Sequence, residues 1–133
     1  MFRYAGDDVQ GKMPQYEIGE LPDGFSENPQ KGFCTAGMSV HYYEDKDGEA
    51  IVLRYIYMQQ GSMSGVDTEN SDIISVSVNG CDGYLIIPKE AGCNNTITWS
   101  DAESNLHFTI DAPLGKNDIL HIAESVYLVK TTK

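Results

Sequence analysis

Three histidines and three cysteines are the side chains in this sequence best suited to chemistry. His41 and His107 fall in strand-like segments, and His121 falls in a helical one. None has a second histidine two or four residues away, a spacing that can bring two metal ligands together. A catalytic or metal-binding histidine is therefore the alternative interpretation. A solvated or sheet-face histidine is the default.

The cysteines Cys34, Cys81 and Cys93 are too few and too widely spaced for a disulfide framework or a zinc site. Cys34 has no nucleophile elbow around it, so a small, partly buried thiol is the simpler interpretation. In an up-and-down sheet, Cys81 lies at the end opposite to the other two, which leaves Cys34–Cys93 as the conceivable pair. We expect no structural disulfide.

Carboxylates are abundant, but they do not form a recognisable site. The segment at 45–49 has the alternating acids of a calcium loop, yet Ala50 and Ile56 stand where an EF-hand needs Gly and a bidentate acid. A hairpin turn explains the segment better. Gly80 to Gly83 lacks the following helix and the Lys of a phosphate loop. The sequence predicts no catalytic residue, no metal site and no cofactor.

Composition narrows the class of protein. The chain has 133 residues, a formal charge of -11 and 41% hydrophobic residues, which suit one domain with a core of its own. The negative charge argues against nucleic-acid binding and against docking on an anionic membrane. No apolar run reaches the ~18–20 residues of a membrane-spanning helix.

The order of elements predicts an α+β domain. Residues 1–15 are expected to be a flexible tail or linker, 16–128 a single domain and 129–133 a frayed end. Strands are expected at 38–44, 49–58, 73–78, 84–88, 95–100 and 106–111, with turns at 45–48, 79–83, 89–94 and 101–105 and a long loop at 59–72. A helix is expected at 116–128, because Ile119, Ile122, Ala123 and Val126 form one apolar stripe. The fold class is an antiparallel β-sheet meander of about six strands, one face covered by a C-terminal α-helix.

Alternation along the strands separates two faces of this sheet. Ile97, Trp99, Phe108 and Ile110 are expected in a core with the helix. Met38, Val40 and Tyr42 are assigned to the core side of their strand. The other face is hydroxyl-rich, and we take it as the possible binding face: Ser39, His41, Tyr43, Ser75, Ser77, Thr96, Thr98, His107 and Thr109.

The order of turn and strand motifs resembles a known family. The series consists of Leu-Pro-Asp-Gly-Phe at 21–25, the hairpin at 43–48, the Asn-Gly turn within 78–85, the Trp strand at 96–101 and the helix at 122–126. It resembles domain-of-unknown-function family 4367, found in Gram-positive bacterial surface proteins. Gly115 departs from the Ser or Thr that members tend to have at the helix cap. The family has no assigned catalytic residues, so none is transferred.

The resemblance implies that the chain is an excised ectodomain, located outside the cell on a protein whose membrane anchor lies elsewhere. Some family members place it behind an anti-sigma-factor-like cytoplasmic part. A cytoplasmic protein is the alternative location. The first functional interpretation is a non-enzymatic sensor or interaction domain for an extracellular protein, peptide or glycan. Two alternatives remain, namely a small hydrolase that uses a histidine and carboxylates, and a carrier for a lipid or other apolar ligand.

Overall fold

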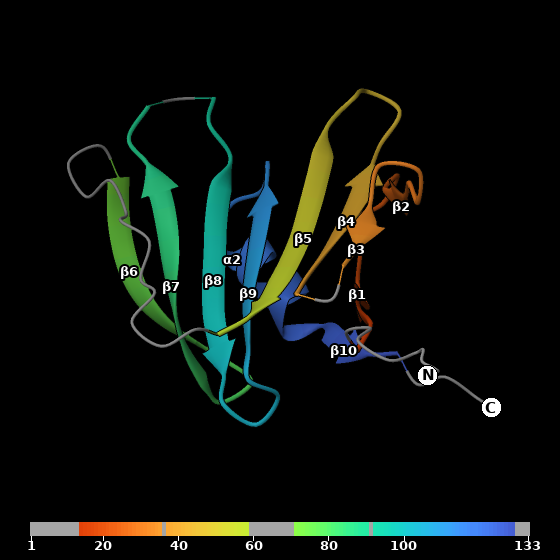
Figure 1. Ribbon diagram of the computed structural model, residues 1–133. Coiled ribbons are helices and arrows are strands. Elements are labelled where there is room, and N and C mark those ends of the chain that lie inside the picture. The colour runs from red at the N-terminus through yellow and green to blue at the C-terminus, as the bar shows by residue number, and fades with distance from the viewer. Residues whose placement is uncertain (1–13, 36, 59–70, 91, 130–133) are drawn as a thin grey trace, which may run out of the picture.

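The computed structural model describes residues 14–35, 37–58, 71–90 and 92–129. These residues form ten strands and the helix α2 (Figure 1). The elements are β1 (Tyr16–Ile18), β2 (Ser26–Glu27), β3 (Phe33–Cys34), β4 (Met38–Glu44), β5 (Ala50–Tyr57), β6 (Ser71–Val78), β7 (Cys81–Pro88), β8 (Asn95–Asp101), β9 (Leu106–Ala112), α2 (Lys116–Glu124) and β10 (Val126–Leu128). Of the predicted tail at 1–15, the predicted loop at 59–72 and the predicted frayed end at 129–133, residues 1–13, 59–70 and 130–133 lie outside the described residues. Residues 71 and 72 belong to β6 and not to the loop.

The strands form an antiparallel eight-stranded sheet and a separate two-stranded one. The large sheet has the order β2-β4-β5-β9-β8-β7-β6, with β3 beside β2 on the edge of β4, and the small sheet pairs β1 with β10. This confirms the α+β class and the six strands from residue 38 onward, to which the structure adds four short strands. The meander is corrected at one point, because β5 pairs with β9 and not with β6. The chain crosses from β5 to the far edge, and β6 to β9 then return toward β5.

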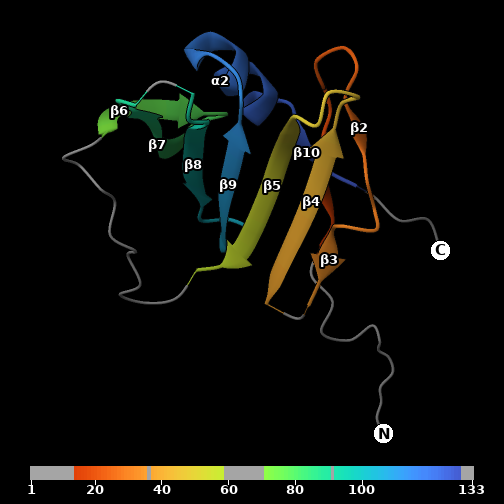
Figure 2. The same ribbon diagram turned by 90° about the horizontal axis from the view of Figure 1, so that it is seen from above.

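One face of the large sheet carries the other elements. The helix α2 contacts β6, β8 and β9. The β1 residue Tyr16 packs its ring edge-on against Tyr55 and Phe108, with ring centroids 5.3 and 5.0 Å apart. Figure 2 shows α2 on one side of the sheet. We call this side the core face and the opposite side the open face.

The core lies between these layers. Ile97, Ile110 and Ile119 have no exposed surface, and Trp99 stacks on Phe108 at a centroid distance of 5.1 Å. The predicted core is therefore confirmed, with Val126 only partly buried against it. On β8 and β9 every second side chain points into the core, as the alternation predicts.

The turn between β6 and β7 is shorter than predicted. Only Asn79 and Gly80 form it, with φ values of 52° and 86°, and β7 already begins at Cys81. Positive φ at both central residues is the geometry that two-residue hairpins prefer. Gly83 is part of the strand, where an added Cβ would lie 2.8 Å from the Trp99 Cβ. The close approach of β7 and β8 therefore requires a glycine there.

The helix is shorter than its apolar stripe suggested. It begins after Gly115, which offers no side-chain cap, and it ends at Glu124, where the Ser125 hydroxyl donates to the Ile122 carbonyl at 2.7 Å. Val126 lies on β10 opposite Ile18, so the assignment of residues 125–128 to the helix is wrong. Pairing with a strand more than a hundred residues away decides the conformation, and local periodicity does not contain that information.

Candidate functional site

The open face is the candidate site, and it carries six of the nine predicted binding residues. The register places Thr98 beside Thr109 and Thr96 beside Asp111 on the same side of the sheet. Ser75 and Ser77 of β6 continue this side beyond β7. Figure 1 views this face from the front, with α2 behind the sheet. The six residues that the structure brings together here are Ser75, Ser77, Thr96, Thr98, His107 and Thr109.

The other three predicted residues lie on the opposite side. Ser39, His41 and Tyr43 pair with Tyr55, Leu53 and Ile51 on the core face. Their exposed fractions are 0%, 9% and 2%, so their assignment to one face with the other six is wrong. Met38, Val40 and Tyr42 point to the open face instead. The apolar alternation of β4 misled the prediction because the polar tips on its buried side find partners that are distant in sequence.

Those partners come from β1 and β2. The Tyr16 amide donates to the Tyr55 hydroxyl at 2.8 Å, and the Ile18 amide donates to the Tyr43 hydroxyl at 3.3 Å. The intervening residue Glu17 pairs with Tyr127 of β10. The amides of Tyr16 and Ile18 point away from β10, and the two tyrosine hydroxyls accept hydrogen bonds from them. Burial raises the pKa of both tyrosines, which keeps the hydroxyls protonated.

His41 links two strands of this layer. Its Nδ1 lies 2.9 Å from Glu27 Oε2, and its Nε2 lies 3.3 Å from both the Ser39 hydroxyl and the Tyr55 hydroxyl. In neutral His41, an Nδ1–H that donates to the carboxylate leaves Nε2 to accept from the hydroxyls. Glu27, His41 and Ser39 thus have the order of an acid–base–nucleophile triad. The Ser39 hydroxyl is fully buried, however, so a substrate cannot reach it in this structure.

His107 lies on the open face near the start of β9, the middle strand of the large sheet. Its Nδ1 lies 2.8 Å from the Ser100 hydroxyl, and its Nε2 lies 2.5 Å from Thr98 Oγ1. Since Thr98 donates its own proton to the Phe108 carbonyl at 2.9 Å, it accepts from His107 and fixes the Nε2–H tautomer. Burial, helped by the nearby Arg54 charge, lowers the pKa of His107, so the ring is neutral at pH 7.

Several open-face residues were not predicted as part of the site. Arg54 of β5 pairs with Thr109, and Asp111 accepts a hydrogen bond from Thr96 Oγ1 at 2.5 Å. Tyr84 of β7 pairs with Thr98 and is 49% exposed. Alternation on β7 and β8 would have placed Tyr84 and Ser100 there. The placement of Arg54 beside Thr109 depended on the pairing of β5 with β9, which the sequence does not reveal.

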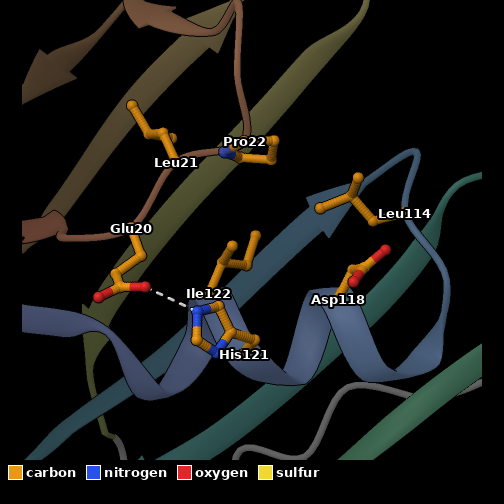
Figure 3. Close-up of a pocket in the computed structure, with 7 residues that line it drawn as sticks. All are labelled: Glu20, Leu21, Pro22, Leu114, Asp118, His121 and Ile122. Carbon is orange, nitrogen blue, oxygen red and sulfur yellow. Dashed lines mark hydrogen bonds and ion pairs between the residues drawn. The ribbon is translucent and has the colours of Figure 1, made fainter.

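Two shallow hollows lie away from this face. One of about 260 Å³ lies between α2 and the turn after β1, where His121 Nε2 is 2.7 Å from Glu20 Oε1 (Figure 3). The other, of about 490 Å³, lies near the start of β2 and the turn after β4, where Asp45 accepts backbone amides of its own hairpin. Those bonds confirm the hairpin interpretation of residues 45–49. In the ranges that the structure describes, no three His, Cys, Asp or Glu side chains are grouped to hold a metal ion.

Among the described residues, no helix has the length and apolar character to cross a membrane.

Comparison with known proteins gives the family. A search of curated proteins found no match to the chain. A family model described as "Domain of unknown function (DUF4367)" matches residues 15–126, from just before β1 to the first residue of β10. Because this match covers most of the chain and agrees with the order of motifs, the protein belongs to the DUF4367 family.

Proposed function

We propose that this chain is a non-enzymatic, extracytoplasmic recognition domain of a membrane-anchored bacterial protein, which binds an extracellular protein, peptide or glycan through its open face. The observation that carries the proposal is the asymmetry of the large sheet. The helix and the small sheet both cover the core face. The open face presents polar side chains that are half-buried among their own neighbours.

The composition of the open face suits recognition. Tyr84 and Arg54 are exposed, and both residue types are enriched where proteins bind partners. Thr98 and His107 are already fixed by hydrogen bonds, so little side-chain freedom is lost when a partner binds. Ile73, 37% exposed on the same side, adds apolar area at the edge. The surface therefore combines fixed polar groups with exposed aromatic and apolar ones.

The two alternative functions have less support. A hydrolase built on Ser39 would need a nucleophile that substrate can reach, and Ser39 is fully buried. A lipid carrier would need a cavity between sheet and helix, and that layer is filled by side chains such as Leu85, Ile97 and Ile119, all at 0% exposure. The extracellular location rests on the resemblance to bacterial surface proteins.

The proposal is tested by binding of the purified domain to the surface of Gram-positive cells, measured by flow cytometry. Tyr84→Ala and His107→Ala should each lose binding while the melting temperature shows a folded domain. Tyr127→Ala is the matched control, because Tyr127 is also 49% exposed but lies on the small sheet. Equal losses from Tyr84→Ala and Tyr127→Ala, or no binding by the parent domain, would contradict the proposal.

A second assay addresses the enzyme alternative. We expect no turnover of simple esters, peptides, glycosides or phosphoesters. Turnover that disappears in Ser39→Ala, with the fold retained, would establish the Glu27–His41–Ser39 group as a catalytic site and overturn the non-enzymatic assignment.

A further inference from the structure

The two edges of the large sheet differ in how they are protected. At one edge, the two-residue strands β2 and β3 cover β4. At the other edge lies β6, a strand of eight residues that pairs only with β7 among the described residues. Its sequence, Ser-Asp-Ile-Ile-Ser-Val-Ser-Val, contains no Pro, Gly or Lys and one charge, Asp72. A long regular edge without such features is a template for pairing with another strand.

The turn after β6 decides which backbone groups face outward. In a two-residue hairpin the residues that flank the turn, here Val78 and Cys81, form a hydrogen-bonded pair. The pairs then alternate, so Ile74 and Val76 also direct their backbone groups toward β7. Ile73, Ser75 and Ser77 direct their N–H and C=O groups to the free edge. Their side chains lie on the open face, and Ser75 and Ser77 are exposed.

We infer that β6 pairs antiparallel with β6 of a second copy of this chain, with Ser75 opposite its counterpart on the two-fold axis. In this register Ile74 lies opposite Val76, so the partly buried apolar side chains of the edge cover one another. Ile73 lies opposite Ser77, and Asp72 lies opposite Val78. The strand is therefore self-complementary, because no two like charges face each other.

Moving the two-fold axis by one residue changes where the single charge of the strand lies. With Ser75 on the axis, Asp72 lies opposite Val78, in the last pair of the ladder. With Ile74 on the axis, Asp72 lies opposite Val76, one pair further in, and with Val76 on the axis only residues 74–78 remain paired. An axis between two residues would pair outward-facing backbone groups with inward-facing ones, which an antiparallel ladder does not allow. The register centred on Ser75 is therefore the one that pairs residues 72–78 with each other and keeps the charge of Asp72 at the end of the ladder.

The symmetry of this dimer bears on the open face. A two-fold axis that relates antiparallel neighbours in one sheet is perpendicular to the sheet, so both open faces point the same way and both α2 helices lie on the other side. The two copies then form one continuous surface. Because each copy carries a charge of -11, added salt should strengthen the dimer by screening their repulsion.

Sedimentation velocity of the full chain between about 1 µM and about 1 mM tests the inference. The parent chain should form a dimer as concentration rises, and higher salt should shift the equilibrium toward dimer. Ser75→Pro removes an outward N–H without touching the β6–β7 ladder, so it should weaken the dimer at least about tenfold. Ser75→Ala, which keeps the N–H, should dimerise like the parent chain. A parent chain that stays monomeric throughout overturns the inference.

Charge variants test the register and do not depend on the folding of the proline variant. Ser75→Lys places two lysines opposite each other and should weaken the dimer about two- to fivefold. Ser77→Lys changes the net charge equally but faces Ile73, so it should not weaken the dimer. An equimolar mixture of Ser75→Lys and Ser75→Glu should form a heterodimer tighter than either homodimer. Equal effects of the two lysine variants, or no gain on mixing, would overturn pairing centred on Ser75.

Discussion

His41 and His107 lie on opposite faces of the same sheet and bond to different partners. The Glu27 carboxylate accepts a hydrogen bond from His41 Nδ1, whereas the Thr98 hydroxyl accepts one from His107 Nε2. The two rings therefore cannot share a substrate or a metal ion. One belongs to the buried layer that holds the first two strands, and the other belongs to the surface that we propose for recognition.

The tautomer and burial of His107 predict a pH dependence of stability. The pKa of His107 is lowered in the folded state, so the unfolded chain binds more protons as the pH falls below about 6.5. The neutral ring's contribution to stability is thus complete above that pH and is lost as the pH falls toward the lowered pKa. Urea unfolding between pH 7.5 and 5 should show a steeper loss for the parent chain than for His107→Gln. Parallel curves would contradict this.

The hydrogen bonds from β1 amides to the tyrosine hydroxyls should stabilise the fold measurably. Tyr55→Phe leaves the Tyr16 amide without its acceptor and should cost about 1–2 kcal/mol in the free energy of unfolding. Hydrogen exchange of the Tyr16 amide should become faster in the same variant. Tyr57→Phe is the control, because Tyr57 is 36% exposed at the end of the same strand. An equal effect of both substitutions would show that the hydroxyl does not hold β1.

Burial at the helix–sheet contact predicts a larger loss. Ile119 is fully buried, so Ile119→Ala should lower the free energy of unfolding by about 2–5 kcal/mol. Leu128→Ala removes a comparable side chain that is 45% exposed, and it should cost much less. Chemical denaturation of both variants measures the difference. Similar losses would argue against α2 as the cover of the core face.

The three thiols should react at different rates. Cys34 and Cys93 are exposed, whereas Cys81 is partly buried. Burial, together with the charges of Asp101, Glu103 and Asp82, raises the pKa of Cys81 and reduces its thiolate fraction. Titration of the native protein with Ellman's reagent should show two fast thiols and one slow thiol. Unreduced, unfolded protein should yield three free thiols, and a single free thiol would indicate a Cys34–Cys93 bond.

The sequence predicted the parts of the fold that follow from local pattern. On β8 and β9, alternation assigns every side chain to the correct face, because both strands lie between a filled core and an open polar surface. The same reasoning failed on β4, where the buried side carries Ser39, His41 and Tyr43. Their partners, Glu27 and the amides of β1, come from short strands with no clear periodicity.

The order of the strands in the sheet was the second feature that the sequence did not predict. A meander is the simplest connection, but β9 comes between β5 and the rest of the sheet. This order joins Arg54 to Thr109 and brings a positive charge near His107, which no local signal indicates. Six residues of the candidate surface were identified from alternation, which could also have added Tyr84 and Ser100. Arg54 depended on the pairing of β5 with β9, which are distant in the chain.

The pairing of β1 with β10 has a consequence for synthesis on the ribosome. The Val129 amide donates to the Gln15 carbonyl at 2.7 Å, so the first and last strands close on each other. A nascent chain can assemble β6 to β9 as soon as residue 112 has emerged, because those pairings are between neighbours. The amides of β1 can already bond to the hydroxyls of Tyr55 and Tyr43, but β1 lacks its strand partner β10 until residue 128 has left the exit tunnel. A chain arrested shortly before that point would have a complete large sheet, but its β1 would be bonded on one side only.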